Sequence, residues 1–331
     1  MSAVDQASQP EAAQPSAAER RLARISNLSH VQLRTPRMEE SIRFFTDVLG
    51  MVVTERDGDM TYLRCFGDYM HHALVLRADP TPGLDHVAYR LEAAEDLADF
   101  AARLRESGHA VTEVPAGTER GQGDAIRFED LDGHPFELFH DYERAAPQHP
   151  SLLRNQPEAY PYRGVGARRI DHINLFTPDV GAERGFLESQ LGFKLREGVQ
   201  MGDGAEIGAW MSVTVNVHDI ALTLDRSERP KRGRLHHVAF YVDSREQMLQ
   251  GADLMAELGV NVEAGPAKHG ITQAFFMYVI EPGGNRIELF SGGYQIFEPD
   301  WQPVIWGEED FERAIIWWGA RLPQSYLEYG T

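Results

Sequence analysis

Two histidines and one glutamate have residue types and surroundings that suit a metal ion. His172 lies in IDHINL, His237 in LHHVAF and Glu288 in GNRIELF, and each of these runs is typical of a strand. A lone strand histidine is usually an ordinary core or surface residue, but a buried carboxylate without a partner costs on the order of several kcal/mol or takes up a proton. A metal ion removes that cost. Two imidazoles and one carboxylate are the ligands of a facial triad, which leaves positions open on Fe(II) for further ligands.

The sequence contains internal repeats, and these show which elements must position the three residues. The segment that begins at Leu28 matches the one that begins at Ile170, and the segment from Leu84 matches the one from Leu235. Each copy has the pattern of an alternating strand, an amphipathic helix and further strands. We therefore predict an α+β fold of four βαβββ modules, paired into two open-barrel domains. The predicted modules are residues 27–77, 84–140, 169–225 and 235–291.

Alternation along two of the predicted strands separates the histidines from the core. In HINLF and HHVAF successive side chains point to opposite faces of a sheet. The apolar side chains then face one way, while His172 and His237 face the inside of a curved sheet. Two modules that face each other make an open barrel whose interior can hold a metal.

Composition shifts along the chain divide it further. The first residues are rich in Ala, Ser, Gln, Pro and Glu without an apolar run, which indicates a disordered leader and no secretory signal. A Pro-containing stretch separates the two pairs of modules, and a helical pattern around Phe311–Gly319 predicts a tail that packs on the second domain. The predicted parts are a leader 1–24, a non-catalytic N-terminal domain 25–143, a linker 144–166, a catalytic domain 167–291 and a tail 292–331.

Charge and cysteine content exclude several classes of partner. The net charge of -19 and the pI near 5.1 argue against binding to nucleic acid or to an anionic membrane surface. No stretch is long and apolar enough to cross a bilayer. Cys65 is the one cysteine of the sequence, so no intrachain disulfide can form and nothing indicates an oxidising compartment. We predict a cytoplasmic protein.

A spaced motif around the glutamate resembles a known signature. The motif reads His269-x7-Met277-Tyr278-x2-Glu281-Pro282-x-Gly284-x3-Glu288. It resembles the signature of class I extradiol dioxygenases, within the vicinal oxygen chelate superfamily and its glyoxalase-like fold. The run NVHDIAL before GRLHHVAF resembles the catechol 2,3-dioxygenase branch, and the likeness covers about residues 27–325. One departure is Ala267, where the signature usually has Gly, Asn, Thr, Ile or Val.

The resemblance implies a role for each polar residue of the second domain. The two histidines and the glutamate of the candidate metal centre would bind Fe(II), and the same ligands also suit Mn(II). His218 would lie beside the O2 site as an acid–base group and as a hydrogen-bond donor. His269 and Tyr278 would hydrogen-bond the oxygens of a catecholate. His236 points to the opposite face from its neighbour and has a structural role, and no role is assigned to His71 or His72.

The implied activity is extradiol ring cleavage of catechol or alkyl-substituted catechols with O2. The products would be of the 2-hydroxymuconic semialdehyde type, in the catabolism of aromatic compounds, and the family implies a homo-oligomer, either a dimer or a tetramer. Two alternatives remain open within the superfamily: a non-catalytic module that binds small molecules, and a glyoxalase-type isomerase. The binding module would not need His218, His269 and Tyr278 together with a complete triad. The His-Asp-x-Ala element and the Tyr-x2-Glu-Pro spacing favour the dioxygenase over the isomerase.

The first domain repeats the three candidate ligands. His30, His86 and Glu137 occupy the equivalent positions, and the offset of 151 residues that relates His86 to its counterpart also relates Glu137 to its own. The same offset places Thr118 and Arg127 where the second domain has its two catecholate-binding residues. The sequence therefore leaves a metal in the first domain open, but it predicts no catalysis there because the acid–base set is missing.

Residues near the predicted site favour an apolar substrate. The homoprotocatechuate branch of the family holds a carboxylate with basic residues at places that read Ala264 and Ala314-Ile315 here, ahead of Trp317 and Trp318. A buried carboxylate without a basic partner would cost on the order of several kcal/mol. These residues therefore predict an apolar pocket rim and a preference for catechol and alkylcatechols over carboxylated catechols.

Overall fold

The computed structural model describes residues 23–145, 163–227 and 231–331. Most of the predicted leader 1–24 and linker 144–166 lies outside these residues. No helix among the described residues is long and apolar enough to cross a membrane.

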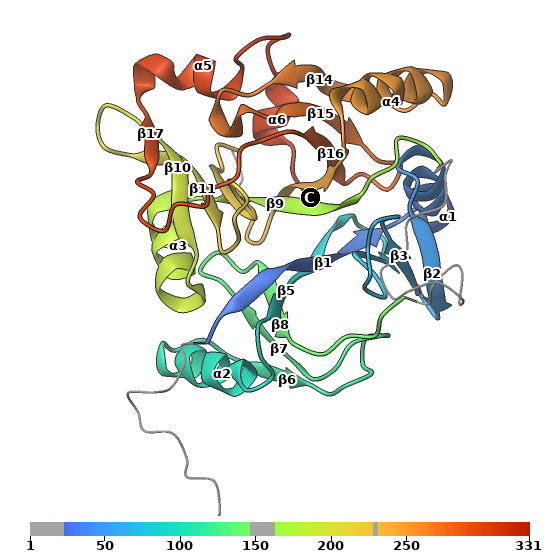
Figure 1. Cartoon of the computed structure of the whole chain (residues 1–331), viewed down its shortest axis with the longest axis vertical. Coiled ribbons are helices and arrows are strands. Elements are labelled where there is room, and N and C mark those ends of the chain that lie inside the picture. The colour runs from blue at the N-terminus through green and yellow to red at the C-terminus, as the bar shows by residue number, and fades with distance from the viewer. Residues whose placement is uncertain (1–22, 146–162, 228–230) are drawn as a thin grey trace, which may run out of the picture.

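Two mixed β-sheets form the body of the molecule, one from each half of the chain (Figure 1). The first sheet has eight strands in the order β2-β3-β4-β1-β5-β8-β7-β6. Its strands are β1 Ile25–Thr35, β2 Val52–Asp57, β3 Met60–Arg64, β4 Leu74–Ala78, β5 Gly83–Leu91, β6 Thr112–Val114, β7 Ala125–Glu129 and β8 Pro135–Phe139.

The second sheet has nine strands in the order β14-β15-β16-β13-β9-β12-β11-β10-β17. Its strands are β9 Arg169–Thr177, β10 Lys194–Gln200, β11 Glu206–Ser212, β12 Ile220–Leu224, β13 Leu235–Tyr241, β14 Val262–Lys268, β15 Phe275–Ile280, β16 Arg286–Ser291 and β17 Val304–Trp306. The order of the first eight of these strands repeats that of the first sheet, so the predicted α+β fold of four βαβββ modules is confirmed.

One helix follows the first strand of each module. The helices are α1 Met38–Arg43 with its continuation η1 Phe44–Val48, α2 Asp96–Glu106, α3 Val180–Phe186 with its continuation η2 Leu187–Leu191, and α4 Arg245–Glu257. Local sequence starts two of them: the Asp179 side chain accepts from the backbone N–H of Ala182, and Ser244 forms a capping box with Gln247. Such caps satisfy backbone donors that the first helical turn leaves free.

The faces of the central strands divide as the alternation predicts. Ile173 and Leu175 of β9 belong to the apolar core. His172 and Asn174, which alternate with them along the strand, line a cavity on the other face. The core is continuous from one domain to the other, because residues of both sheets and of their helices belong to it. The period of two along each strand therefore directs polar side chains into the barrel and apolar ones onto the neighbouring domain.

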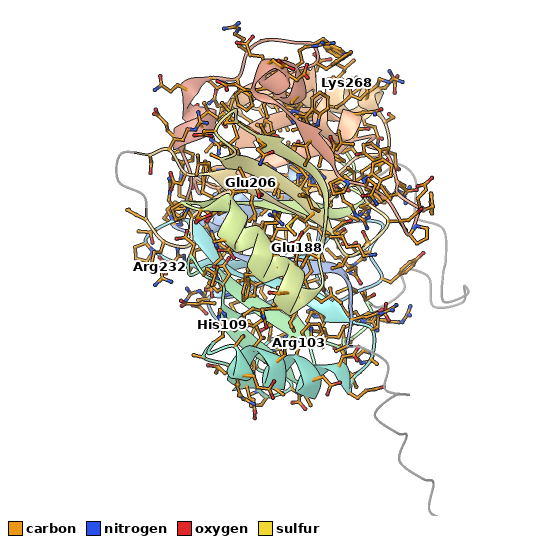
Figure 2. The ribbon with its side chains drawn as sticks, turned by 90° about the vertical axis from the view of Figure 1, so that its left-hand side faces the viewer. Arg103, His109, Glu188, Glu206, Arg232 and Lys268 are labelled. Atoms are coloured by element: carbon orange, nitrogen blue, oxygen red, sulfur yellow. The ribbon has the colours of Figure 1, made fainter. Side chains whose placement is uncertain are left out.

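The two domains contact each other through this core and through polar contacts at its rim. The Arg103 guanidinium of α2 donates to the carbonyl of Gln190 in η2 over 3.0 Å, and Figure 2 shows Arg103 lying below α3. At another point, Ser41 of the first domain donates to the Glu281 carboxylate of the second over 2.7 Å.

The C-terminal tail adds a strand and two short helices to the second domain. β17 pairs in parallel with β10, and the helices are α5 Phe311–Ile315 and α6 Gln324–Glu328. The helix predicted around Phe311–Gly319 ends early, because the backbone turns extended at Ile316 and Trp317 donates its N–H to the carbonyl of Lys268. This pairing brings the segment after α5 to the strand that precedes His269.

Candidate metal centre

The three predicted ligands lie together on adjacent strands of the second sheet. His172 is on β9, His237 on β13 and Glu288 on β16, and all three side chains are buried. The two Nε2 atoms lie 3.2 Å apart, and the carboxylate Oε2 lies 2.9 Å from His172 Nε2 and 3.0 Å from His237 Nε2. An octahedral ion with ligand distances of about 2.1 Å separates neighbouring donor atoms by about 3.0 Å. The spacing therefore fits one face of such a coordination sphere.

The orientation of these groups also fits a cation. Both oxygens of Glu288 are buried, and neither has a partner with hydrogen-bond geometry among the described residues, although imidazole nitrogens lie within 3.0 Å. The carboxylate oxygens thus converge on the two imidazole nitrogens without a hydrogen bond to either. A buried carboxylate in that state is costly unless a cation occupies the point of convergence.

The ring atoms that face away from this point have partners of their own. Asp171 Oδ1 lies 3.0 Å from His172 Nδ1, an arrangement that fixes the ring and increases its basicity as in other metal centres. His237 Nδ1 lies 2.7 Å from His236 Nδ1, and the His236 ring packs against the rings of Phe176 and Tyr326. His236 therefore lies behind the site, as the sequence predicted.

Electrostatics within the cluster favour a bound positive charge. Burial alone would raise the pKa of the Glu288 carboxyl, but His237 and His172 hold it well below its usual value. Burial lowers the pKa of His172, yet Glu288 and Asp171 more than offset this and bring it to about 9, while burial brings the pKa of His237 to about 4. His172 therefore carries a proton at pH 7 that a divalent ion would displace, and the resulting set of one carboxylate and two neutral imidazoles suits such an ion.

His218 lies directly beside the three ligands. It precedes β12, and its ring centroid is 3.9 Å from that of His172. Burial, and secondarily the neighbouring His172, lower its pKa well below the usual value, so the ring is neutral at pH 7. Its Nδ1 is buried with no partner among the described residues. A neutral imidazole has one N–H to donate and one lone pair to accept, so the ring can move a proton at this place.

A hydrogen-bonded chain of three side chains lies on the other side of the site. His269 Nδ1 lies 2.5 Å from the carbonyl of Ile315, so this nitrogen carries the proton. His269 Nε2 lies 3.2 Å from the Tyr278 hydroxyl, which is 3.3 Å from the hydroxyl of Tyr326. Burial lowers the pKa of His269 and, together with Glu288, raises that of Tyr278 well above its usual value. His269 is therefore neutral, its Nε2 accepts from the Tyr278 hydroxyl, and Tyr278 keeps its proton.

Tyr326 was not found from the sequence. It lies on α6 in the tail, where no repeat or motif marks it, and only the path of the tail brings it beside Tyr278. Its ring packs 4.9 Å from that of Tyr278 and 4.5 Å from that of His236.

A second, larger cavity adjoins the site. It has a volume of about 520 Å³ and shares Trp210, Ile315 and Tyr326 with the cavity around the three ligands. Trp317 and Trp318 line it and are half-exposed. The remaining lining includes Val199, Ile207, Leu224, Phe311, Ile316, Leu322 and Leu327. Ala264, predicted for the rim, packs instead in the cluster that contains Tyr278 and Tyr326.

Comparison with known proteins places this site in a family. The family model described as "Glyoxalase/Bleomycin resistance protein/Dioxygenase superfamily" matches residues 27–138 and 169–289. A manganese-dependent 2,3-dihydroxybiphenyl 1,2-dioxygenase of Geobacillus genomosp. 3 is 41% identical over 91% of this chain and 96% of its own length. A metapyrocatechase of Geobacillus stearothermophilus is 39% identical over 93% of this chain and 94% of its own length.

A solved structure agrees with these relatives. The extradiol ring-cleaving dioxygenase from B. fuscum superimposes with a TM-score of 0.85 at 32% identity, over 94% of this chain and 83% of that one. The chain therefore belongs to the Glyoxalase/Bleomycin resistance protein/Dioxygenase superfamily and, within it, to the metal-dependent extradiol ring-cleaving dioxygenases. The resemblance seen in the sequence motif is confirmed.

Proposed function

We propose that this enzyme uses Fe(II), bound by His172, His237 and Glu288, to open the ring of catechols that carry an apolar substituent. The convergence of three donor atoms beside an unpartnered His218 and a cavity of about 520 Å³ supports this proposal. Mn(II) is the alternative ion, because the same ligands suit it and the Geobacillus relative is named as manganese-dependent.

The residues around the triad divide the proton transfers between them. When bound, the metal supplies a route for electrons from a coordinated catecholate to O2. His269 Nε2 can only accept, because the carbonyl of Ile315 fixes the proton on Nδ1, so it takes the proton of a catechol hydroxyl. The phenolic Tyr278 donates to the resulting oxygen anion, and Tyr326 donates in turn to Tyr278.

His218 performs a separate task on the O2 side. Its neutral ring and its unpartnered Nδ1 lie next to His172, away from the His269–Tyr278 chain. We assign it to donate a hydrogen bond to the oxygen molecule and to shuttle the proton that the departing oxygen needs. Such a transfer is most effective when the pKa of the group lies near the operating pH, and a negative charge on the oxygen beside the ring raises the pKa of His218 toward that value.

The larger cavity is proposed to hold the substituent of the ring. Trp210, Ile315 and Trp317 give it apolar walls, and each fully buried methylene contributes up to about 0.8 kcal/mol to binding. An alkyl chain fits this lining, and so does a second ring, as in the substrate named for the Geobacillus dioxygenase.

Five of the basic residues near the site have partners of their own. Arg234 pairs with Asp225, Arg232 donates to a backbone carbonyl of the first domain, and Lys268 lies over the ring of Phe275. Of the three arginines that also line the large cavity, Arg313 lies over Trp317 and Arg321 pairs with Glu312. The third arginine in the lining of the large cavity is Arg226.

A substrate panel tests the proposal. Enzyme loaded with Fe(II) under anaerobic conditions is mixed with air-saturated catechol, methyl- and propylcatechol, 2,3-dihydroxybiphenyl, protocatechuate and homoprotocatechuate. We expect O2 uptake and a yellow product, with kcat/KM much higher for the apolar substrates. A preference for a carboxylated catechol would overturn the apolar assignment and point to Arg226 as the anion-binding residue. Binding without O2 uptake would instead favour the non-catalytic alternative, and isomerisation without O2 uptake the glyoxalase-type one.

The identity of the metal is tested separately. Metal-free enzyme reconstituted with Fe(II) or with Mn(II) is compared at equal metal content, and we expect the higher kcat with Fe(II). A kcat that is higher with Mn(II) would assign manganese instead. Cytoplasmic location and a homo-oligomeric state remain predictions.

A further inference from the structure

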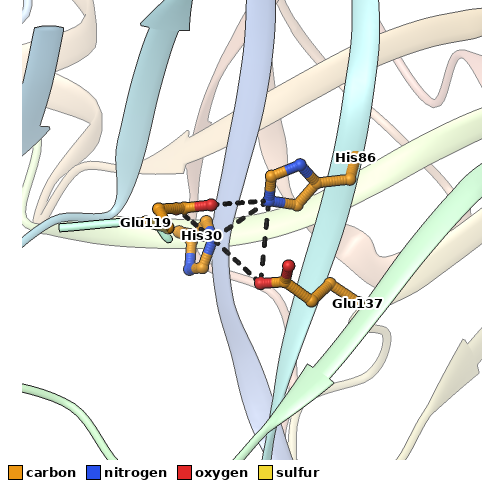
Figure 3. A group of neighbouring side chains, drawn as sticks. All are labelled: His30, His86, Glu119 and Glu137. Atoms are coloured by element: carbon orange, nitrogen blue, oxygen red, sulfur yellow. Dashed lines mark hydrogen bonds and ion pairs between the residues drawn. The ribbon is translucent and has the colours of Figure 1, made fainter. Parts of the chain in front are cut away.

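A second cluster of metal-binding residue types lies in the first domain (Figure 3). Its members are His30, His86, Glu119 and Glu137, all buried, and one ligand atom from each lies within 4.8 Å of the others. His30 Nε2 and His86 Nε2 are 3.3 Å apart. His30 Nε2 lies 3.0 Å from Glu119 Oε1, and His86 Nε2 lies 3.3 Å from Glu119 Oε2. Glu137 Oε1 lies 3.9 and 3.8 Å from the same two nitrogens.

Strand register makes part of this cluster the structural counterpart of the candidate metal centre. Ala88 of β5 pairs with both His30 and Glu137. In the second domain, Ala239 of β13 pairs in the same way with the first histidine and the glutamate of the triad. The two sheets therefore present two imidazoles and a carboxylate in the same arrangement.

His72 also has a counterpart in the second domain. It lies two residues before β4, as His218 lies two residues before β12, and its ring centroid is 4.4 Å from that of His30. The expectation that the whole acid–base set is missing from the first domain is therefore wrong for this residue. His72 Nε2, however, lies 2.9 Å from Glu119 Oε1 and thus faces a carboxylate of the protein.

Glu119 changes what the site can do. It comes from the loop between β6 and β7, and the offset of 151 residues relates it to Gly270, next to His269. A carboxylate of the chain thus lies on the side where the second domain has a substrate-binding cavity. The donor separations of 3.0–3.9 Å, which include both oxygens of Glu119, scatter around the value of about 3.3 Å that a tetrahedral zinc ion with ligand distances of about 2.0–2.1 Å requires.

Further side chains orient the two carboxylates. Arg127 donates to Glu137 Oε2 over 2.5 Å and to Glu119 Oε2 over 3.2 Å, and Gln122 donates to Glu137 Oε1 over 2.6 Å. Ligating carboxylates in metal centres are hydrogen-bonded in this way. The charges also favour a bound cation, because two buried carboxylates face one guanidinium, and an uncompensated buried charge is strongly destabilising.

We propose that the first domain binds a structural divalent metal ion, with Zn(II) preferred, through His30, His86, Glu119 and Glu137. Zn(II) binds nitrogen and oxygen ligands more tightly than Fe(II) or Mn(II), and four protein ligands leave no open position for a substrate. The ion ties the loop that carries Glu119 to strands β1, β5 and β8. It therefore stabilises the first domain and takes no part in ring cleavage.

Metal counting on the full-length protein tests the proposal. Protein expressed with zinc and iron available is freed of loosely bound ions by gel filtration, and its metal content is measured by inductively coupled plasma mass spectrometry. We expect two ions per wild-type chain, one in Glu288→Ala, one in Glu119→Gln and none in the double variant. The matched control His140→Ala changes a histidine of the same domain outside the cluster, and it should keep both ions.

A spectroscopic measurement keeps the test independent of how the variants fold. Co(II) is added to metal-free Glu288→Ala protein, and we expect one equivalent to give the intense visible absorption of tetrahedral Co(II). The same titration of the double variant should give no such band. Two results would overturn the proposal: a wild-type chain that holds a single ion, which Glu288→Ala loses, or a second ion that Glu119→Gln retains. The first would mean that a proton on His86 balances the two carboxylates.

Discussion

The two domains present two histidines and a glutamate in one register, yet their surroundings differ on one side. In the second domain the residue that pairs across the strands with Glu288 is Tyr278, and in the first the residue that pairs with Glu137 is Arg127. Beside Tyr278, both oxygens of Glu288 lack hydrogen bonds among the described residues, whereas Arg127 donates a hydrogen bond to Glu137 Oε2. The second domain also opens into a cavity, where the first supplies Glu119.

We infer from this difference that the ligand triad alone does not make a catalytic site in this fold. A reactive centre needs vacant coordination positions, a cavity that leads to them and groups that exchange protons with the substrate. The first domain retains the strand positions but fills the remaining side with a carboxylate and a guanidinium. Three comparisons between equivalent residues and one comparison within the second domain test this interpretation.

Removal of a ligand should have the largest effect. His237→Ala should lose the catalytic metal and bring turnover below detection, since three ligands leave no redundancy. The equivalent change, His86→Ala, should leave kcat per bound catalytic metal unchanged even if it lowers stability. Steady-state O2 consumption with metal analysis on the same samples measures both. Turnover that vanishes in folded, iron-loaded His86→Ala protein would contradict the division of roles between the domains.

The next largest difference is expected between substitutions of the two histidines that lie beside the clusters. His218→Asn should keep its metal and still bind catechol, but slow the oxygen-dependent steps by about 10²–10⁴-fold. His72→Asn, at the equivalent position, should leave those steps unchanged because its partner is a carboxylate of the protein. Stopped-flow mixing of the anaerobic enzyme–catechol complex with O2 separates catechol binding from the oxygen-dependent steps. An unchanged rate for His218→Asn in air-saturated buffer would remove its proposed role.

Loss of the phenolic hydroxyl should have a smaller effect. Tyr278→Phe removes one hydrogen bond to a charged oxygen, which costs about 1.5–3 kcal/mol and lowers kcat/KM about 10- to 100-fold with the metal retained. Tyr326→Phe should cost less, because its hydroxyl reaches Tyr278 and not the triad. Equal losses in the two variants, measured with the same alkylcatechol, would show that the hydroxyl chain acts as a unit.

The smallest effect on turnover is expected for a residue that only holds the tail, where the change falls on stability instead. Glu197 is buried and accepts hydrogen bonds from Trp306 Nε1, the Thr272 backbone and the Tyr294 hydroxyl, whereas its register counterpart Glu55 is half-exposed. Glu197→Ala leaves three donors without an acceptor and should lower the free energy of unfolding by about 2 kcal/mol or more. Glu55→Ala should cost less than about 1 kcal/mol. Urea unfolding of both variants measures this, and similar losses would deny that Glu197 anchors the tail.

Much of the site was accessible from the sequence because it lies on strands. The alternation in HINLF and HHVAF places His172 and His237 on the concave face, and the motif around Glu288 adds Tyr278 on the neighbouring strand. A comparison of HALVL with HDIAL would also have revealed His72 as the counterpart of His218. Each of these runs ends in a strand that pairs with the first strand of its own domain.

By itself the sequence determined the fold class, the repeat of modules and the faces of the strands, because strand periodicity is a local property that neighbouring residues record. Only the tertiary structure decided that Glu119 closes the first cluster and that Tyr326 and the end of α5 line the second. Glu119 lies in a loop whose repeat counterpart carries Gly270, and Tyr326 lies in a tail that is not repeated. Their positions follow from packing between segments distant in the chain, and no local pattern encodes such contacts.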